Sequence, residues 1–207
     1  MNSTPAVAAT VFGDRLGLAE RYVHLLATGG IERGLIGPRE ADRLWERHLV
    51  NSAVVTELIP GSARVLDVGS GAGLPGIPMA IARPDLQVEL VEPLLRRTTW
   101  LEATVADLGL GDAVVVTRGK VAVIGARQVD VVTARAVAPL ERLLPMCMPL
   151  LRPGGVLLAL KGDRAEAEVE AVHRQASKWR VSSLDVARCG SGVCAEETTV
   201  VVARRSG

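Results

Sequence analysis

The sequence predicts an α/β protein in which a helical N-terminal extension precedes a doubly wound, mostly parallel sheet. Three observations predict this fold. An apolar run is followed directly by three alternating glycines, strand patterns then alternate with amphipathic helix patterns, and the last two strand patterns have no helix between them. Because parallel neighbours need a long crossover, the short final connection predicts a hairpin and one reversed strand. We expect seven strands in all.

Composition indicates one globular core with room for a small appendage, since 48% of the 207 residues are hydrophobic and 23% are charged. The net charge of +1 gives no overall basic field that would indicate a nucleic-acid partner. Three cysteines without a C-x-x-C spacing predict neither a disulfide framework nor a metal site. No apolar run approaches about 18 residues and no signal-peptide pattern occurs, so we expect a cytoplasmic protein without a membrane span. We also expect a monomer.

Residues 1–60 form the predicted extension, which we expect to pack beside a domain at 61–207 and not to fold on its own. The first ten residues are small and polar and are expected to be frayed. Apolar residues across 12–26 recur at spacings of 4, 3, 4 and 3, which predicts an amphipathic helix that a glycine pair at 29–30 ends. A second helical segment is predicted at 38–60, and its apolar side carries Leu44, Trp45, Leu49 and Val55.

The second domain contains the alternating elements. Strand patterns occupy residues 65–68, 86–92, 113–118, 129–134, 156–160, 181–186 and 198–203. Helix patterns occupy residues 77–82, 94–108, 140–148 and 165–179, the last with Asp163 as its expected N-cap. A turn is predicted at residues 152–155 and a hairpin loop at residues 189–197.

The glycine-rich turn after the first strand predicts a nucleotide-type site at the start of the next helix. Residues 71–76 satisfy the dinucleotide pattern G-x-G-x-x-G. The alternating glycines, with an acid two residues before the first, instead resemble motif I of the class I S-adenosylmethionine (SAM) methyltransferases; these residues are Asp67, Gly69, Gly71 and Gly73. In that family the acid lies close to the methionine end of the cofactor. A turn that binds nothing is the third alternative, against which the flanking strand and helix argue.

The reversed last strand favours the methyltransferase alternative, because dinucleotide domains normally continue with a sixth parallel strand. Glu92 ends the second strand, 21 residues beyond Gly71, at the edge where such sheets bind ligands. A carboxylate there can accept both ribose hydroxyls of an adenosine. NAD and SAM share this group, so Glu92 predicts adenosine binding and leaves the choice between them open.

Three strands end in basic residues at the same edge of the sheet, namely Arg118, Arg135 and Lys161. We expect them to gather in one cleft, with Glu92 as the main acid nearby, and to face a polyanion next to the cofactor. No obvious base or nucleophile joins them, since no histidine lies near a strand end, the single tyrosine lies in the extension, and Cys147 is expected in the core. Guanine N7 carries a lone pair and no proton, so a site without a base suits its methylation by direct displacement.

Four sequence words resemble one family over nearly the whole chain. They are Arg47-His48-Leu49-Val50-Asn51-Ser52, the glycine word at residues 67–78, Ala134-Arg135-Ala136 and Leu160-Lys161-Gly162. The chain resembles the bacterial 16S rRNA guanine-N7 methyltransferases (RsmG, formerly GidB). The resemblance implies a SAM-dependent enzyme that methylates N7 of a guanine in the 530 loop of 16S rRNA, with the 30S ribosomal subunit as its partner.

The resemblance also implies roles for individual residues. Gly69 and Leu74 line the SAM pocket, and Arg135 contacts the cofactor or the guanine. A main-chain pair after the third strand, Val121-Ala122, stands where the family has Ala-Glu. The predicted site is therefore Arg135 and Lys161 as catalytic residues; Asp67, Gly69, Gly71, Gly73, Leu74, Glu92, Val121, Ala122 and Arg135 at the cofactor; and Arg47, His48, Arg118, Arg135 and Lys161 at the RNA.

Several alternatives stay open at this point. Arg47 and His48 either contact RNA or pack a helix against the sheet. Asn51 replaces the family's Asp, and Ala122 its Glu. These departures leave a methyltransferase of the same fold acting on another RNA or a small molecule as the main alternative, and a NAD-binding protein without methyl transfer as a further one.

Overall fold

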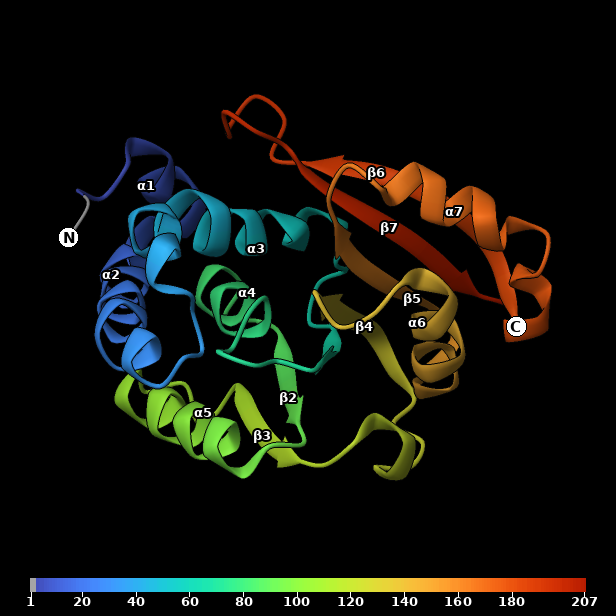
Figure 1. Ribbon diagram of the computed structural model, residues 1–207, viewed down its shortest axis with the longest axis horizontal. Helices are drawn as coiled ribbons and strands as arrows, with labels where there is room; N and C mark the ends of the chain where they lie inside the picture. The colour runs from blue at the N-terminus through green and yellow to red at the C-terminus, as the bar shows by residue number, and fades with distance from the viewer. Residues whose placement is uncertain (1–2) are drawn as a thin grey trace.

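The computed structural model describes residues 3–207 and has the predicted seven-stranded, mostly parallel sheet at its centre (Figure 1). The strands are β1 (Arg64–Val68), β2 (Gln87–Glu92), β3 (Val114–Arg118), β4 (Val129–Arg135), β5 (Leu151–Lys161), β6 (Val181–Cys189) and β7 (Thr198–Arg205). Their order is β3-β2-β1-β4-β5-β7-β6, and β7 runs antiparallel to both of its neighbours. The expected doubly wound sheet with one reversed strand is confirmed.

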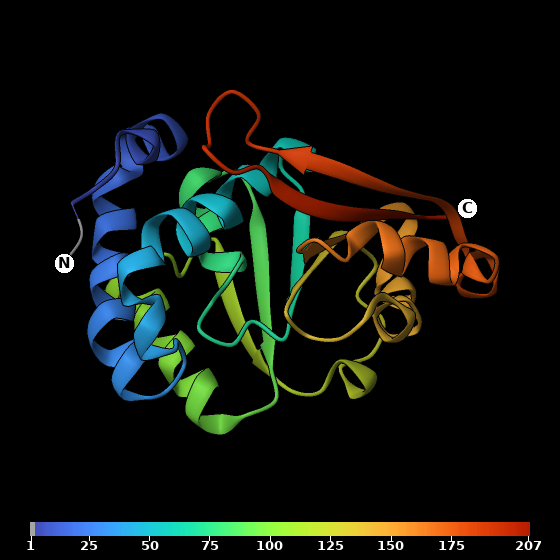
Figure 2. The ribbon, with the colours of Figure 1, turned by 45° about the horizontal axis from the view of Figure 1, so that its top comes forward.

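Helices cover both faces of this sheet (Figure 2). They are α1 (Ala6–Phe12), α2 (Leu16–Leu25), α3 (Asn51–Ala53), α4 (Gly76–Ala82), α5 (Leu95–Asp107), α6 (Leu140–Cys147) and α7 (Ala165–His173). Short 3-10 or π-helical turns complete the helical segments: η1 (Gly13–Arg15), η2 (Leu26–Gly30), η3 (Pro38–Arg43), η4 (Leu44–Val50), η5 (Val54–Leu58), η6 (Val121–Val123), η7 (Met148–Leu150) and η8 (Ala176–Trp179). No helix in the described part of the chain is long and apolar enough to cross a membrane.

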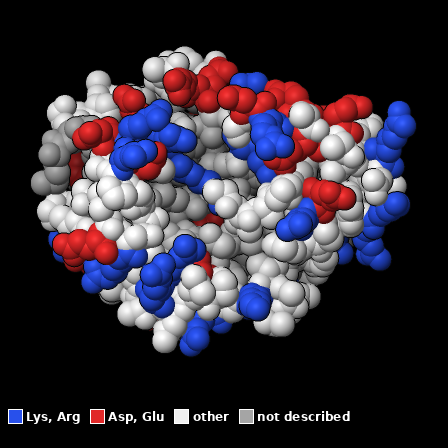
Figure 3. All heavy atoms as spheres, viewed as in Figure 1, with Lys and Arg blue, Asp and Glu red and all other residues white. Residues whose placement is uncertain are grey.

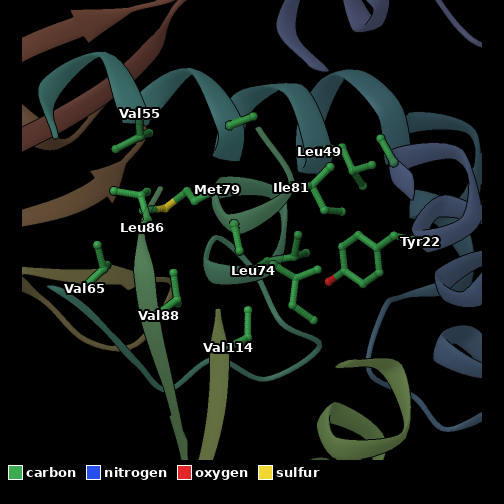
Figure 4. Packing of buried hydrophobic residues seen from close by; sticks show 14 of the residues in the cluster. Tyr22, Leu49, Val55, Val65, Leu74, Met79, Ile81, Leu86, Val88 and Val114 are labelled. Carbon is green, nitrogen blue, oxygen red and sulfur yellow. The ribbon is translucent and has the colours of Figure 1, made fainter. Parts of the chain in front are cut away.

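The sheet separates two hydrophobic clusters, as the alternation of side chains along a strand requires. In β1, Val65 belongs to the cluster that also holds the extension, α4 and α5, whereas Leu66 and Val68 belong to the cluster with α6. Figure 4 shows the first cluster, in which the Tyr22 ring lies near Leu74 and close to residues of the sheet domain. The extension and the sheet therefore share one core.

The N-terminal segment differs from the prediction at two places. Residues 6–10 are helical within α1, where a frayed end was expected, because an alanine-rich run follows Pro5 and buries Ala8 and Phe12. The part of that prediction on residues 1 and 2 lies outside the described residues. The glycine pair does not end the next helix, since residues 31–32 are still helical after η2 and the carbonyls of both glycines accept later backbone N–H groups.

Three boundaries in the sheet domain also differ. β5 begins at Leu151, so the segment expected as a turn is the first part of that strand, and an irregularity between Val129 and Val131 of β4 accommodates it. Asp163 does not cap α7, because Arg164 occupies the N-cap position. α7 ends at His173, with η8 after it, and β6 extends to Cys189.

The glycine turn after β1 is held from two sides through one carbonyl group. The Tyr22 hydroxyl donates to the carbonyl oxygen of Ala72 at 2.9 Å, and Trp100 Nε1 donates to the same oxygen at 3.0 Å. Tyr22 is fully buried, and burial raises its pKa well above the ordinary value, which keeps the hydroxyl a donor. Tyr22 comes from the extension and Trp100 from α5, so two distant segments fix the turn.

We expect Gly73→Ala to destabilise the protein by roughly 3 kcal/mol, because the new methyl group would meet neighbours in a tightly packed place. A Cβ at Gly73 would lie 2.4 Å from Ile77 Cδ1 and 2.9 Å from Tyr22 Oη, and its φ is +107°. Urea unfolding measures the difference. Gly109→Ala is the matched control, because φ is +62° there and nothing lies within 4 Å. Equal losses in the two variants would contradict the packing role of Gly73.

Candidate functional site

Three glycines shape the turn between β1 and α4, and they differ in burial and in what surrounds them. All three have positive φ, at +68° for Gly69, +57° for Gly71 and +107° for Gly73. Gly73 is buried against Ile77, so its missing side chain serves packing. Gly69 and Gly71 are partly exposed, and a Cβ at Gly71 would have no neighbour closer than 3.8 Å. A ligand can therefore approach the backbone at Gly71.

Asp67 supports the turn from the interior of the protein, and its side chain does not reach the surface. Its carboxylate accepts the Gly76 N–H at 3.2 Å and the Thr133 hydroxyl at 2.9 Å, and its side chain is fully buried. Burial raises its pKa from 3.8 to about 6. The structure thus gives Asp67 a role in joining β1, β4 and the start of α4, and offers no exposed atom for the direct contact that the resemblance implied.

Glu92 lies at the end of β2, beside the exposed part of the turn. Its carboxylate accepts the Gly71 N–H at 3.1 Å and the Leu94 N–H at 3.0 Å, and Arg97 Nη1 lies 3.5 Å away. Arg97 also carries a buried Nε–H that has no hydrogen-bond partner. Glu92 is only 2% exposed and both of its oxygens accept backbone N–H groups, so in this structure its carboxylate fixes the backbone around Gly71. Arg97 was not among the residues predicted for the site.

Leu74 and the pair Val121-Ala122 occupy different surroundings. Leu74 is buried in the cluster shared with the extension. Val121 lies in η6 after β3 and packs on the cluster with α6, as Val137 does, while Ala122 is exposed. Val137 Cγ2 would lie 2.9 Å from a Cβ at Gly69, so the segment after β4 covers that glycine.

Arg135, at the end of β4, is bonded to the extension through both terminal nitrogens. Nη1 donates to the Ser52 hydroxyl at 2.9 Å and to the His48 carbonyl at 3.3 Å. Nη2 donates to the Arg47 carbonyl at 3.0 Å and lies 2.7 Å from His48 Nδ1. A guanidinium has four terminal N–H groups, and all four are used here. In this arrangement Arg135 is a latch between sheet and extension, and the predicted contact with cofactor or guanine is not available to these groups.

His48 is held as one tautomer by its two partners. Arginine can only donate, so Nδ1 accepts from Arg135, and Nε2 donates to the Glu40 carboxylate at 2.9 Å. Burial and the charge of Arg135 lower the pKa of His48 from 6.5 to about 4, which keeps the ring neutral. The prediction that no histidine lies near a strand end is wrong, because the extension brings His48 to the end of β4. The side chain of Arg47 is exposed, whereas His48 is buried.

A cleft of about 900 Å³ lies between the extension, the ends of β4 and β5, and the β6–β7 loop. Figure 3 shows a hollow in this region, with basic side chains to either side and acidic ones along one rim. The cations that line it are Arg43, Arg47, Arg135 and Lys161, and the carboxylates are Glu46, Asp163, Glu196 and Glu197. The expectation of a cationic cleft with Glu92 as the main acid is therefore wrong, since the charges of the lining balance.

Two of the three cations predicted at strand ends line the cleft. Lys161 lies there, but its Nζ already donates to the Ala138 carbonyl and to Glu168, each at 2.8 Å. Arg118 is exposed at the end of β3, which is an edge strand, and it is absent from the lining. Strand order explains this result, because β2, β1 and β4 separate β3 from β5.

The chain matches one protein family over most of its length. Residues 15–198 match the family model "GidB: rRNA small subunit methyltransferase G". The chain is similar to the ribosomal RNA small subunit methyltransferase G of Thermobifida fusca, at 56% identity over 94% of this chain and 82% of the relative. The protein of the same name from Frankia casuarinae is 51% identical over 98% of this chain and 78% of its own.

Solved structures support the fold. The TYW2 protein of M. jannaschii, crystallised in complex with AdoMet, superposes with a TM-score of 0.60 over 78% of this chain and 77% of its own, at 17% identity. Identity at this level carries the fold alone, which is the class I methyltransferase fold predicted from the glycine turn and the reversed last strand.

The two buried ionisable groups of the site make opposite predictions for stability against pH. The unfolded chain binds the proton of His48 more readily than the native state between pH 6.5 and about 4, so this group removes stability as the pH falls. The native state binds the proton of Asp67 more readily between about pH 6 and 3.8, so this group adds stability as the pH falls. Each effect is worth roughly 3 kcal/mol at most, and they offset each other.

Asp67→Asn is therefore expected to lose stability more steeply than the unmodified protein between pH 6.5 and 4, because the effect of His48 is no longer offset. Urea unfolding at several pH values measures the two slopes, and all other groups titrate alike in both proteins. His48→Asn retains an acceptor near the position of Nδ1 and is expected to change the slope in the opposite direction. Identical slopes in all three proteins would contradict both pKa shifts.

Proposed function

The chain belongs to the small-subunit rRNA methyltransferase G (GidB) family, and from this premise we propose that it transfers a methyl group from SAM to N7 of a guanine in the 530 loop of 16S rRNA. The observation that carries the proposal is the match over residues 15–198, together with a cleft at the end of β4, the strand that lies next to β1 in the sheet. SAM supplies the methyl group as an electrophile when it is bound. The chain's own residues hold and orient the two reactants.

The exposed part of the turn and the end of β2 are the proposed cofactor contacts. Gly71 lets the backbone approach the ligand, and Glu92 offers a carboxylate next to it. The unpartnered Nε–H of Arg97 adds a donor at the same place. The proposed cofactor environment also includes Gly69, Leu74, Val121 and Ala122. Asp67 and Gly73 do not contact the cofactor in this proposal, and they fix the turn from the interior of the protein.

The histidine near the cleft and the tyrosine behind the glycine turn are both engaged, which fits an acceptor nitrogen that carries a lone pair and no proton. Both ring nitrogens of His48 are engaged, by Arg135 and by Glu40. The Tyr22 hydroxyl is buried and donates to Ala72. Cys147 is fully buried, and burial raises the pKa of its thiol to about 12. Cys194 lines the cleft, and burial raises the pKa of its thiol too, so neither cysteine is an activated nucleophile. Guanine N7 needs none of these groups, which makes it the proposed acceptor.

The extension forms one wall of the cleft and is the proposed RNA contact. Arg43 and Arg47 line the cleft with exposed side chains, and Lys161 lies on the opposite wall. Arginine forks suit phosphates and guanine edges. A second candidate function, methylation of another RNA or of a small molecule, is favoured by the four carboxylates of the same cleft.

Purified protein is expected to transfer labelled methyl groups from SAM to 30S subunits that lack the modification, at one guanine of the 530 loop. Because N7-methylation labilises the base, reduction followed by aniline cleavage identifies both the position and the nitrogen. Free 16S rRNA and a transfer RNA serve as comparison substrates. SAM binding without incorporation into 30S subunits would exclude this substrate and favour the second candidate.

Arg135→Ala is expected to lower methyl transfer by at least ~100-fold, because it releases the extension from the end of β4 and so misplaces the cleft wall. Arg118→Ala removes the same charge from a strand end outside the cleft and is expected to retain most of the activity. Single-turnover assays on 30S subunits measure both, with circular dichroism as the check on folding. Comparable losses in the two variants would contradict the latch.

A further inference from the structure

A second pocket lies at the amino ends of the parallel strands, opposite the ends where the glycine turn lies. Its volume is about 290 Å³, and its lining consists of Leu144, Pro145, Met148, Pro149, Lys178, Trp179, Arg180 and Arg205. The turn follows the carboxyl end of β1, whereas Arg205 ends the reversed strand β7, whose Arg204 pairs with Val156 near the start of β5. The pocket is therefore separate from the cleft. We call it the C-terminal pocket.

The charge of the C-terminal pocket is not balanced. Its lining includes three cations, Lys178, Arg180 and Arg205, and no carboxylate. None of the three forms an ion pair within the described part of the chain. Lys178 Nζ donates to the neutral side chain of Gln175 at 3.3 Å, and Arg205 Nη1 to the carbonyl groups of Pro149 and Leu151. Figure 3 shows basic side chains projecting at the edge where the chain ends. Such a site favours an anion.

The same pocket offers an aromatic surface. Trp179 is half-buried, while the other two tryptophans, Trp45 and Trp100, are only 6% and 7% exposed. Leu144, Met148 and two prolines complete an apolar lining. Aromatic side chains next to cations are the combination that binds single-stranded nucleic acid, since bases stack on the ring and phosphates meet the charges. The volume lies near the lower end of small-ligand sites, about 300 Å³.

The backbone holds this arrangement in place. Arg180 has a φ of +58°, a left-handed conformation that an arginine rarely adopts. Its carbonyl accepts the Ser206 N–H at 2.8 Å and the Ser206 hydroxyl at 3.1 Å. Ser206 thereby ties η8 to the end of β7, and the backbones of Arg180 and Arg205 are held at one pocket.

We propose that the C-terminal pocket binds a single-stranded nucleotide of the same ribosomal RNA, with a phosphate at Lys178, Arg180 and Arg205 and a base against Trp179. This inference rests on the proposed function, which makes an RNA the partner. The cleft is balanced in charge, whereas the C-terminal pocket has cations alone, so the pocket adds phosphate affinity to that of the cleft arginines. One substrate is engaged at two edges of the sheet.

A direct binding experiment tests the pocket without using methyl transfer. Oligouridylate of eight nucleotides is titrated into the whole protein while tryptophan fluorescence is recorded. Quenching is expected, and it arises from Trp179, because the other two tryptophans are buried. Trp179→Phe is expected to abolish the signal and to retain part of the affinity, measured by anisotropy of a labelled oligonucleotide. Inorganic tripolyphosphate in place of the RNA tests whether any polyanion gives the same quenching.

Salt dependence tests the cations. Lys178→Ala and Arg180→Ala are each expected to make the slope of log K against log salt shallower by about 0.7, the value for one phosphate contact of a single strand. On 30S subunits they are expected to raise KM at least fivefold with kcat unchanged. Arg21→Ala is the control, because Arg21 is exposed and paired with Asp107 at 2.5 Å, and it is expected to change neither quantity.

The outcomes separate the two proposals. The proposal that the pocket binds RNA would be overturned by any of three results. These are no quenching by RNA, equal quenching by tripolyphosphate, and equal effects of Arg21→Ala and Arg180→Ala. Methylation of 30S subunits by the unmodified protein with unchanged KM in the pocket variants would overturn the pocket and leave the proposed function in place. Absence of methylation together with salt-dependent quenching that requires Arg180 would overturn the function and leave an RNA-binding pocket.

Discussion

The carbonyl oxygen of Ala72 is the point on which the site depends, because two donors from distant segments meet there. Tyr22 reaches it from the extension and Trp100 from α5. Inside the turn the N–H groups of Gly73 and Leu74 donate to the Ser70 carbonyl, and the hydrogen bonds to Ala72 tie the turn to the extension and to α5. Asp67 holds the other end of the turn at the Gly76 N–H. The exposed backbone at Gly71 keeps its position because its neighbours on both sides are fixed.

The extension is consequently a part of the site and not an appendage to it. Its tyrosine fixes the glycine turn, and its 48–52 segment receives the guanidinium of Arg135. Both contacts are buried or half-buried, where a lost hydrogen bond costs more than it does at the surface. The end of β4 and the wall of the cleft therefore move together, and the geometry offered to a substrate depends on residues far from the sheet in sequence.

Sequence patterns predicted the parts of this structure that depend on local spacing. The sheet and its reversed strand could be predicted from the strand runs, the connection lengths and the short final loop, because these patterns depend only on residues near one another in the sequence. The partners of Arg135 were beyond such patterns, since His48 lies 87 residues away and the glycine turn and sheet must form before the two meet. The burial of Tyr22 could have been inferred from the spacing of Ala19, Tyr22 and Leu26, three and four residues apart, all of which are fully buried.

Charge was the property that sequence position predicted least well. Their positions at strand ends predicted that Arg118, Arg135 and Lys161 would lie together. Strand order places Arg118 outside the cleft. The β6–β7 loop brought Glu196 and Glu197 into it, and a loop has no periodicity from which its position could be derived.

The balance of charge in the cleft has a physical use under the proposed function. Methylation at N7 leaves the guanine with a positive charge, which a cleft lined only by cations would oppose. Four carboxylates among the lining residues offset the four cations there, so the cleft can accept a base whose charge rises during the reaction. Phosphate recognition requires the opposite sign of field, and the unbalanced cations of the C-terminal pocket provide it at the other edge of the sheet. A net charge of +1 therefore conceals two surfaces of different character, each suited to one part of a nucleic-acid ligand.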